Sequence, residues 1–95
     1  MAKVKTRVFD AARYLETPEA ISVYLEDIFE TENPELIAHA LGTVARAKGM
    51  TEVARKTGLS RESLYKALSA KGNPEFATIL KVMRALDLKI TAKAG

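Results

Sequence analysis

The sequence contains no cysteine and no tryptophan, a single histidine, three prolines and five glycines among its 95 residues. The lack of cysteine excludes disulfides and thiolate metal sites, and it suits a reducing compartment. A hydrophobic content of 47% and an aromatic content of only 6% favour a compact helical protein over disorder or a β-sandwich. No apolar run approaches the length of a membrane span, and the start lacks the apolar middle of a signal peptide. We therefore expect one small, soluble, cytoplasmic protein.

The single histidine, His39, argues against catalysis. A metal ligand or a general base needs companions at close spacing, and none stands near His39 on the polar side of its predicted helix. No glycine-rich phosphate loop follows a strand, and no serine can be given a base from the sequence. We therefore expect a protein that is not an enzyme and that binds neither a metal nor a cofactor.

Charge is unevenly distributed along the chain. Residues 16–45 contain seven acidic residues and neither lysine nor arginine, whereas residues 46–71 contain seven basic residues and two acidic ones. The two regions should therefore prefer different partners, unless both are simply solvated helix faces.

All three prolines follow a residue that can cap a helix and precede a glutamate. Threonine and asparagine side chains accept hydrogen bonds from the first helical amides, proline loses no hydrogen bond at the first position, and glutamate suits the positive end of the helix dipole. The pattern therefore predicts three helix starts. They are Thr17-Pro18-Glu19, Asn33-Pro34-Glu35 and Asn73-Pro74-Glu75.

Apolar residues recur at helical spacing after each of these starts. The first stripe, residues 21–29, has an acidic opposite face, and the second, residues 36–45, ends near Gly49. The third stripe, residues 76–86, is so broad that it needs burial on more than one side, and we expect its helix to sit centrally. The tail LKITAK alternates apolar and polar residues and could form a short strand, although it would need a partner such as a symmetry mate.

The stretch TEVARKTGLSRESLYKAL, residues 51–68, predicts two short helices joined by a tight turn. Thr51 can cap a helix over residues 52–57, and Gly58 can adopt the left-handed conformation that ends it. Ser60 can then cap a helix over residues 61–69. Leu59 would fill the corner between the helices. This is the helix-turn-helix pattern, and the local excess of positive charge favours DNA binding over a plain αα-corner.

These residues also resemble a known family. TEVARKTGLSRESLYKALSAKGNPEFATILKVMRALDL is similar to Cro and Xre-type helix-turn-helix domains in its turn glycine, serine cap, glycine-containing loop, proline and leucine-rich closing helix. From about Phe9 to Ile90 the chain resembles the HigA-like addiction-module antidote proteins, through FDAARYL, NPELIAHALGTVARAKGMTEVARKTGLSRESLYKALS and GNPEFATILKVMRALDLKI. The resemblance implies an all-α fold, a five-helix Cro/Xre-like helix-turn-helix domain with an N-terminal helical extension. We place the acidic extension at residues 1–33, for toxin contact or dimerisation, and the DNA-binding domain at residues 34–95.

The resemblance also implies a function. Such a protein is the antitoxin of a bacterial type II toxin-antitoxin module, which binds operator DNA as a dimer and represses its own operon. It neutralises a small basic toxin of the RelE or ParE type, commonly one that cleaves mRNA. The alternative is a phage-type helix-turn-helix repressor without a toxin partner. One residue departs from the family pattern, because Glu52 stands where many Xre domains place a phosphate-contacting glutamine, and a carboxylate would repel the DNA backbone.

The second helix of the motif should enter the major groove with its N-terminal residues at the base edges. Arg61 or Lys66 could bind guanine, and Glu62 could accept a hydrogen bond from the amino group of cytosine. Alternatively, Glu62 is an acid in the first turn that the helix dipole favours, and the two interpretations are equally weighted. Tyr65 could reach the sugar-phosphate or pack at the rim. The predicted base contacts are Arg61, Glu62, Ser63 and Lys66. The predicted DNA backbone contacts, for some of which simple solvation is the alternative, are Arg46, Lys48, Thr51, Arg55, Lys56, Ser60, Tyr65 and Lys71.

The acidic N-terminal segment is not needed by a helix-turn-helix domain. A toxin that cleaves RNA must attract RNA, so its surface should be basic and complementary to this segment. The predicted toxin contacts are Phe9, Tyr14, Leu15, Glu19, Glu26, Asp27 and Glu30. The alternative is that the apolar members of the segment extend the core or a dimer interface.

Overall fold

The computed structural model describes residues 15–69 and 71–95, and these residues form five α-helices. The helices are α3 (Pro18–Glu30), α4 (Pro34–Lys48), α5 (Met50–Thr57), α6 (Arg61–Ala67) and α7 (Phe76–Ala85). The predicted all-α class is confirmed. The short strand that LKITAK could form with a partner is not found in the single chain, where residues 88–95 have no regular secondary structure. A lone extended segment has no partner to complete its hydrogen bonds.

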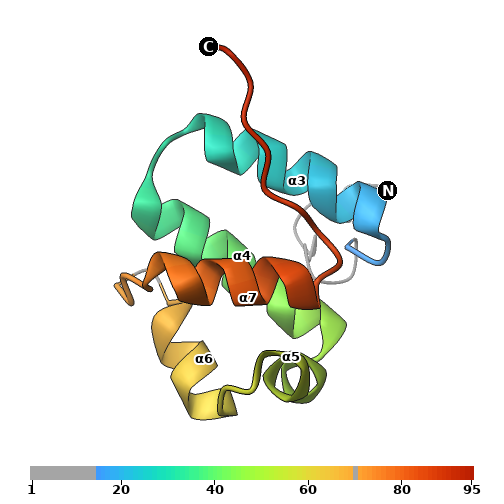
Figure 1. The fold of residues 1–95 in the computed structure, drawn as a ribbon, viewed down its shortest axis with the longest axis vertical. Helices are drawn as coiled ribbons and strands as arrows, with labels where there is room; N and C mark the ends of the chain where they lie inside the picture. The colour runs from blue at the N-terminus through green and yellow to red at the C-terminus, as the bar shows by residue number, and fades with distance from the viewer. Residues whose placement is uncertain (1–14, 70) are drawn as a thin grey trace, which may run out of the picture.

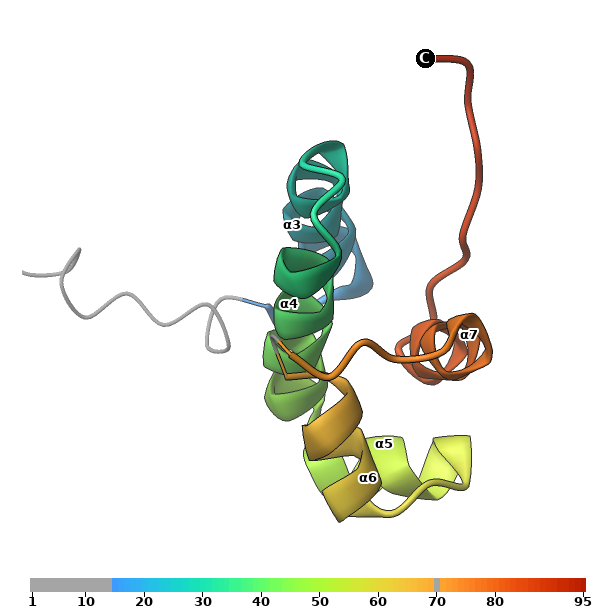
Figure 2. The same ribbon diagram turned by 90° about the vertical axis from the view of Figure 1, so that its left-hand side faces the viewer.

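The helices surround α4, which runs through the middle of the molecule (Figure 1). The helix α3 packs against one end of α4, and α5 and α6 lie at the other end. The helix α7 packs on α5 and leads into a C-terminal tail that runs past α3 (Figures 1 and 2). The α5–α6 unit and the acidic helix α3 therefore lie at opposite ends of the molecule.

One hydrophobic core joins the five helices. Each leucine or valine buried in it contributes about 1.5–3 kcal/mol. Because helices as short as α5 and α6 are unstable alone, this burial holds them in place. The largest fully buried side chains are Leu15, Ile21, Leu41, Leu64, Leu86, Val44, Val53 and Val82.

Two of the three predicted helix starts are confirmed. The hydroxyl of Thr17 accepts a hydrogen bond from the Ala20 amide at 3.1 Å, and the side chain of Asn33 accepts one from the Leu36 amide, also at 3.1 Å. Both capping residues have extended backbone, as a residue before a helix must. The helices α3 and α4 then begin at the prolines that follow.

The third predicted start is wrong, because α7 begins at Phe76 and its first turn has no side-chain cap. Asn73 has a φ of 47° in place of the extended conformation of a capping residue. The chain at this point passes very close to α6: a Cβ atom on Gly72 would lie 2.2 Å from the carbonyl oxygen of Lys66. The chain that leaves α6 is thus held against the end of that helix, and α7 begins only after Pro74.

The apolar stripe of α7 is buried on one side only, so the expectation of burial on more than one side is wrong. Val82 and Met83 belong to the core, whereas Phe76 is 65% exposed and Leu80 is 44% exposed. Among the described residues, no element covers these two side chains. The exposed part of the stripe becomes a surface that is available to a partner.

Gly42 lets α4 approach the end of α6. This residue is buried inside α4, and a Cβ atom on it would lie 2.7 Å from the carbonyl oxygen of Leu68. Real Cβ atoms do not come so close to a carbonyl oxygen, so the packing requires the missing side chain. The position of α6 on the molecule therefore depends on a glycine of α4, outside the segment that forms α5 and α6.

Candidate nucleic-acid interface

The turn between α5 and α6 has the conformation expected from its glycine. Gly58 has φ 77° and ψ 10°, which is left-handed, and its amide donates to the Ala54 carbonyl at 2.9 Å. Glycine adopts this conformation without the steric cost of a Cβ atom. Leu59, half-buried, packs against the core in the corner between the helices. The predicted sharp bend is confirmed.

The N-terminus of α6 is capped as expected, whereas that of α5 is not. The hydroxyl of Ser60 accepts a hydrogen bond from the Ser63 amide at 3.0 Å. The helix α5 begins at Met50 with Gly49 before it and has no side-chain cap, so Thr51 lies within the first turn and the cap predicted for it is wrong. Gly49 is both the C-terminal capping residue of α4 and the residue before α5, and it has no side chain that could accept a hydrogen bond from the α5 amides. At its other end, α6 stops at Ala67, two residues before the predicted end.

The exposed side of α6 carries all four predicted base-contacting residues. Leu64 is fully buried and Leu68 is 3% exposed, and these two leucines fix the helix to the core. Tyr65 is 44% exposed and extends the same outward side. The four exposed residues are Arg61, Glu62, Ser63 and Lys66. The structure thus brings them onto one accessible surface, while their contacts with bases stay predictions.

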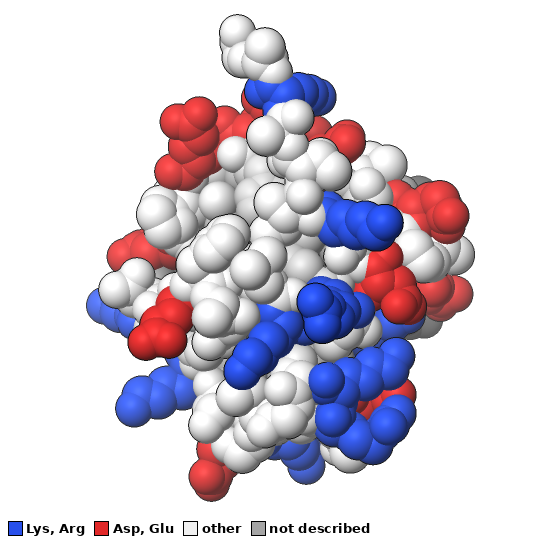
Figure 3. Space-filling view, in the orientation of Figure 1, with Lys and Arg blue, Asp and Glu red and all other residues white. Residues whose placement is uncertain are grey.

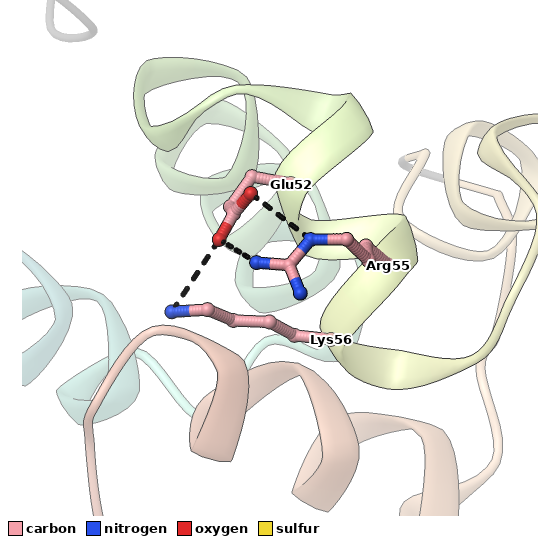
Figure 4. A network of polar contacts seen from close by, with 3 residues as sticks. All are labelled: Glu52, Arg55 and Lys56. Atoms are coloured by element: carbon pink, nitrogen blue, oxygen red, sulfur yellow. Dashed lines mark hydrogen bonds and ion pairs between the residues drawn. The ribbon is translucent and has the colours of Figure 1, made fainter.

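Glu52 forms ion pairs with two of the predicted phosphate contacts, Arg55 and Lys56. Arg55 donates hydrogen bonds to both carboxylate oxygens of Glu52, and the Lys56 ammonium lies 3.8 Å from the same group (Figure 4). The hydrogen bond from Arg55 is the main cause that lowers the pKa of the Glu52 carboxyl below its usual value, and the positive charges of Arg55 and Lys56 act in the same direction. The carboxylate therefore stays ionised and holds both cations on the surface of α5. The spacing of three and four residues could have predicted this pairing from the sequence.

The remaining predicted phosphate contacts are spread over the molecule. Arg46 is exposed on α4 and donates to the Thr43 hydroxyl at 3.3 Å. Lys48 is half-buried at the end of α4, and Lys71 is exposed after α6. Thr51 is exposed in the first turn of α5, whereas the Ser60 hydroxyl is engaged in the α6 cap. The structure places these residues on separate elements and leaves their roles as predictions.

Two exposed cations of α7 were not among the predicted phosphate contacts. Lys81 and Arg84 are exposed at a spacing of three residues on the polar side of α7. On the face that Figure 3 shows, basic side chains gather over α5 and α7, and acidic ones gather around α3. The two cations lie outside α5 and α6, although their spacing of three residues is visible in the sequence.

The chain matches a known protein family over most of its length. Residues 5–94 match the family described as probable addiction module antidote protein. The chain belongs to this antidote family. A Haemophilus influenzae protein, described as an uncharacterized protein, is 54% identical over 81 residues, which cover 85% of this chain and 84% of the relative. No solved structure matches the chain. The family description supports the predicted antitoxin of a toxin-antitoxin module, and the HigA-like and Cro/Xre-type assignments stay predictions.

The antidote protein exposes the acidic residues predicted to contact a toxin. Leu15, in contrast, is 1% exposed in the core and is not available at the surface. Phe9 and Tyr14 lie outside the described residues. The predicted division at residue 33 stays a prediction, and Ile21 and Leu25 share the core of the helices that follow it. The exposed acidic residues are Glu19, Glu26, Asp27 and Glu30.

His39 of the antidote protein is exposed on α4. In the residues that the structure describes, no three potential ligands come together as a metal site. None of the described helices combines the length and the apolar character that a membrane crossing requires.

Proposed function

We propose that this antidote protein binds operator DNA as a homodimer through α5 and α6, represses its own operon, and neutralises a small basic toxin of the RelE or ParE type. The observation that carries the DNA-binding part is the orientation of α6. Its leucines are buried, and its first turn offers Arg61, Glu62 and Ser63 to the outside next to the Gly58 turn. Membership of the antidote family favours this function over a phage-type repressor without a toxin.

The chemistry of the α6 surface fits a DNA major groove. A helix of this diameter enters the groove, and its N-terminal residues reach the base edges. Arg61 would bind a guanine, and Lys66, five residues further along α6, is exposed as well. A single copy offers few base contacts, so two copies would bind half-sites about 34 Å apart, one helical turn of DNA.

The acidic helix α3 suits a toxin with a basic surface. Acidic side chains gather there at the end of the molecule opposite α6, so DNA and toxin could bind without competing for the same residues (Figures 1 and 3). Charge complementarity of this kind accelerates association and selects the partner. We propose that the protein acts by binding alone and has no catalytic activity.

A mobility-shift titration tests the DNA-binding proposal. The probes are the DNA directly upstream of the operon that encodes this protein and a scrambled duplex of the same composition. The proposal predicts that the upstream DNA binds about a thousandfold more tightly or better at physiological salt. Equal affinity for the two duplexes would refute operator binding.

A separate co-expression experiment tests the toxin part. A short open reading frame for a basic protein of about the size of a single small domain should lie beside this gene. Expression of that frame alone should stop growth, and co-expression of the antidote protein should restore it. Growth arrest that the antidote protein does not relieve would refute neutralisation and leave the DNA-binding proposal standing.

A further inference from the structure

An open groove of about 830 Å³ lies between α3, α7 and the C-terminal tail. Its floor is apolar and contains Leu25, Ile79 and Met83, which are residues of the core or packed against it. None of the residues that line the groove belongs to α5 or α6, so the groove is separate from the proposed DNA-binding surface.

Large apolar side chains around this groove are left in contact with solvent. Phe76 at the start of α7 is 65% exposed, Ile90 in the tail is 44% exposed, and Phe29 on α3 is 37% exposed. They come from three different elements and line one continuous groove. Contiguous exposed apolar surface of this kind marks a site of association.

The tail beside the groove has an unpaired backbone. The last backbone hydrogen bond is the one from the Leu88 amide to the Met83 carbonyl at 2.9 Å, and the described part of the chain gives residues 89–95 no backbone partner. In Figure 2 the tail stands apart from α3. Its alternating sequence places Ile90 and Ala92 on one side of an extended chain and Lys89 and Lys93 on the other. Such an edge can accept a second strand.

The two walls of the groove carry opposite charges. The α3 wall contributes Glu26, Asp27 and Glu30, and the tail contributes Lys89 and Lys93. No ion pair joins the two walls in the described residues. A surface of this kind is self-complementary: a two-fold axis brings the positive wall of one copy against the negative wall of the other.

We infer that the occupant of the groove is a second copy of this chain. The tail of one copy pairs antiparallel with the tail of the other, each tail enters the groove of its partner, and its lysines meet the acidic residues of the partner's α3. The inference rests on the dimer of the proposed function and assigns its interface. A basic toxin fits the groove less well, because Lys89 and Lys93 would repel it. In the dimer, the acidic residues that line the groove are taken by the partner's tail, and Glu19 of α3, which does not line it, stays open to the toxin.

Charge reversal in the full-length protein tests this interface. One variant carries E26K, D27K and E30K on α3, and the other carries K89E and K93E on the tail. All five residues are exposed, so the fold should persist, which circular dichroism checks. Sedimentation equilibrium without DNA or toxin should show the wild type as a dimer and each variant alone with a dimer dissociation constant raised about tenfold or more, because like charges then face each other.

An equimolar mixture of the two variants provides the decisive sample. In a mixed dimer each tail, altered or wild-type, meets an oppositely charged α3 of the other variant, so the inferred interface predicts recovery of the dimer. A contact between the tail and α3 within one chain predicts no recovery on mixing and would overturn the inference. The inference also fails if both variants dimerise like the wild type, or if they dimerise normally and lose only toxin binding, which would assign the groove to the toxin.

Proline substitutions test the pairing of the tails. In an antiparallel pair, the amides of successive residues point alternately toward and away from the partner. Of T91P and A92P, one should therefore weaken the dimer much more than the other, while T91A should have little effect. Equal and negligible effects of both prolines would overturn strand pairing. Operator binding by the wild type is measured separately, so a misplaced interface and a failure of the proposed function are distinguishable.

Discussion

The guanidinium of Arg55 binds the carboxylate of Glu52 one helical turn before it, with Nε 3.4 Å from Oε1 and a second hydrogen bond to Oε2. Lys56 adds its charge to the same carboxylate. Glu52 lies in the first turn of α5, the helix that precedes α6. The cluster holds two positive charges and one negative charge, so Glu52 offsets one of the two positive charges that α5 would otherwise offer to the phosphates.

Glu52→Gln should strengthen binding to operator and scrambled duplexes alike. The substitution removes a negative charge and frees Arg55 and Lys56 for phosphates, which carry no sequence information. Each additional phosphate that the protein neutralises should steepen the slope of log K against log salt concentration by about 0.9. Titrations at several salt concentrations measure both effects. Glu35→Gln, an exposed first-turn acid of α4, is the control and should leave the slope unchanged. Unchanged or weaker binding by Glu52→Gln would show that this cluster does not restrain DNA affinity.

Gly58→Ala should lower the free energy of unfolding by about 1 kcal/mol, the cost of a left-handed conformation for an ordinary residue. A Cβ atom at this position would meet no atom within 4 Å, so backbone strain is the whole cost. Gly58→Asn should cost less, because asparagine tolerates this conformation better. Urea unfolding followed by circular dichroism compares the three proteins. An alanine variant as stable as the wild type would mean that the bend has another conformation.

Gly42→Ala should also destabilise the protein, although alanine is the better helix former by about 1 kcal/mol. The added methyl group would lie 2.7 Å from the Leu68 carbonyl oxygen, so α4 and the end of α6 would have to separate. Ala47→Gly on the same helix is the control for helix propensity and should cost about 1 kcal/mol. Urea unfolding of both variants decides the matter. Stabilisation by Gly42→Ala would show that α6 does not pack so closely on α4.

Glu19→Lys should slow association with the toxin, most strongly at low salt, because it reverses a charge on the acidic helix α3. Glu62→Lys is a matched control, since both glutamates are exposed acids in the first turn of a helix. Surface plasmon resonance with the co-encoded toxin measures the two association rates. Equal slowing by both variants would point to net charge alone, and no slowing by Glu19→Lys would remove this residue from the toxin-binding surface.

Local sequence rules predicted the features that depend on neighbouring residues. The caps at Thr17 and Asn33, the left-handed Gly58 and the Ser60 cap are each decided within four residues, and all four are present. Their physical basis is the pairing of the first helical amides and the freedom of glycine at positive φ. The exposed side of α6 followed from the same helical periodicity.

Features that depend on distant contacts were not predictable in this way. The start of α7 moved past Pro74 because the chain passes the end of α6 at Gly72, a contact that the Asn-Pro-Glu pattern does not contain. The exposure of Phe76 likewise depends on which element covers α7, and the tail has no strand partner in a single chain. The ion pairs of Glu52 were partly predictable. The sequence shows that Arg55 and Lys56 stand three and four residues after Glu52, but it does not show which side-chain atoms meet.

Paired titrations of Arg61→Ala and Lys56→Ala on operator and scrambled duplexes show whether the side of α6 that begins at Arg61 reads the DNA sequence. Arg61→Ala should weaken binding to operator DNA and bind scrambled DNA nearly as tightly as the wild type does. The difference in binding free energy between the two duplexes should therefore shrink by about 1–3 kcal/mol. Lys56→Ala, in contrast, should weaken both duplexes to the same extent and reduce the salt slope. Undiminished discrimination by Arg61→Ala would contradict the assignment of α6 as the recognition helix.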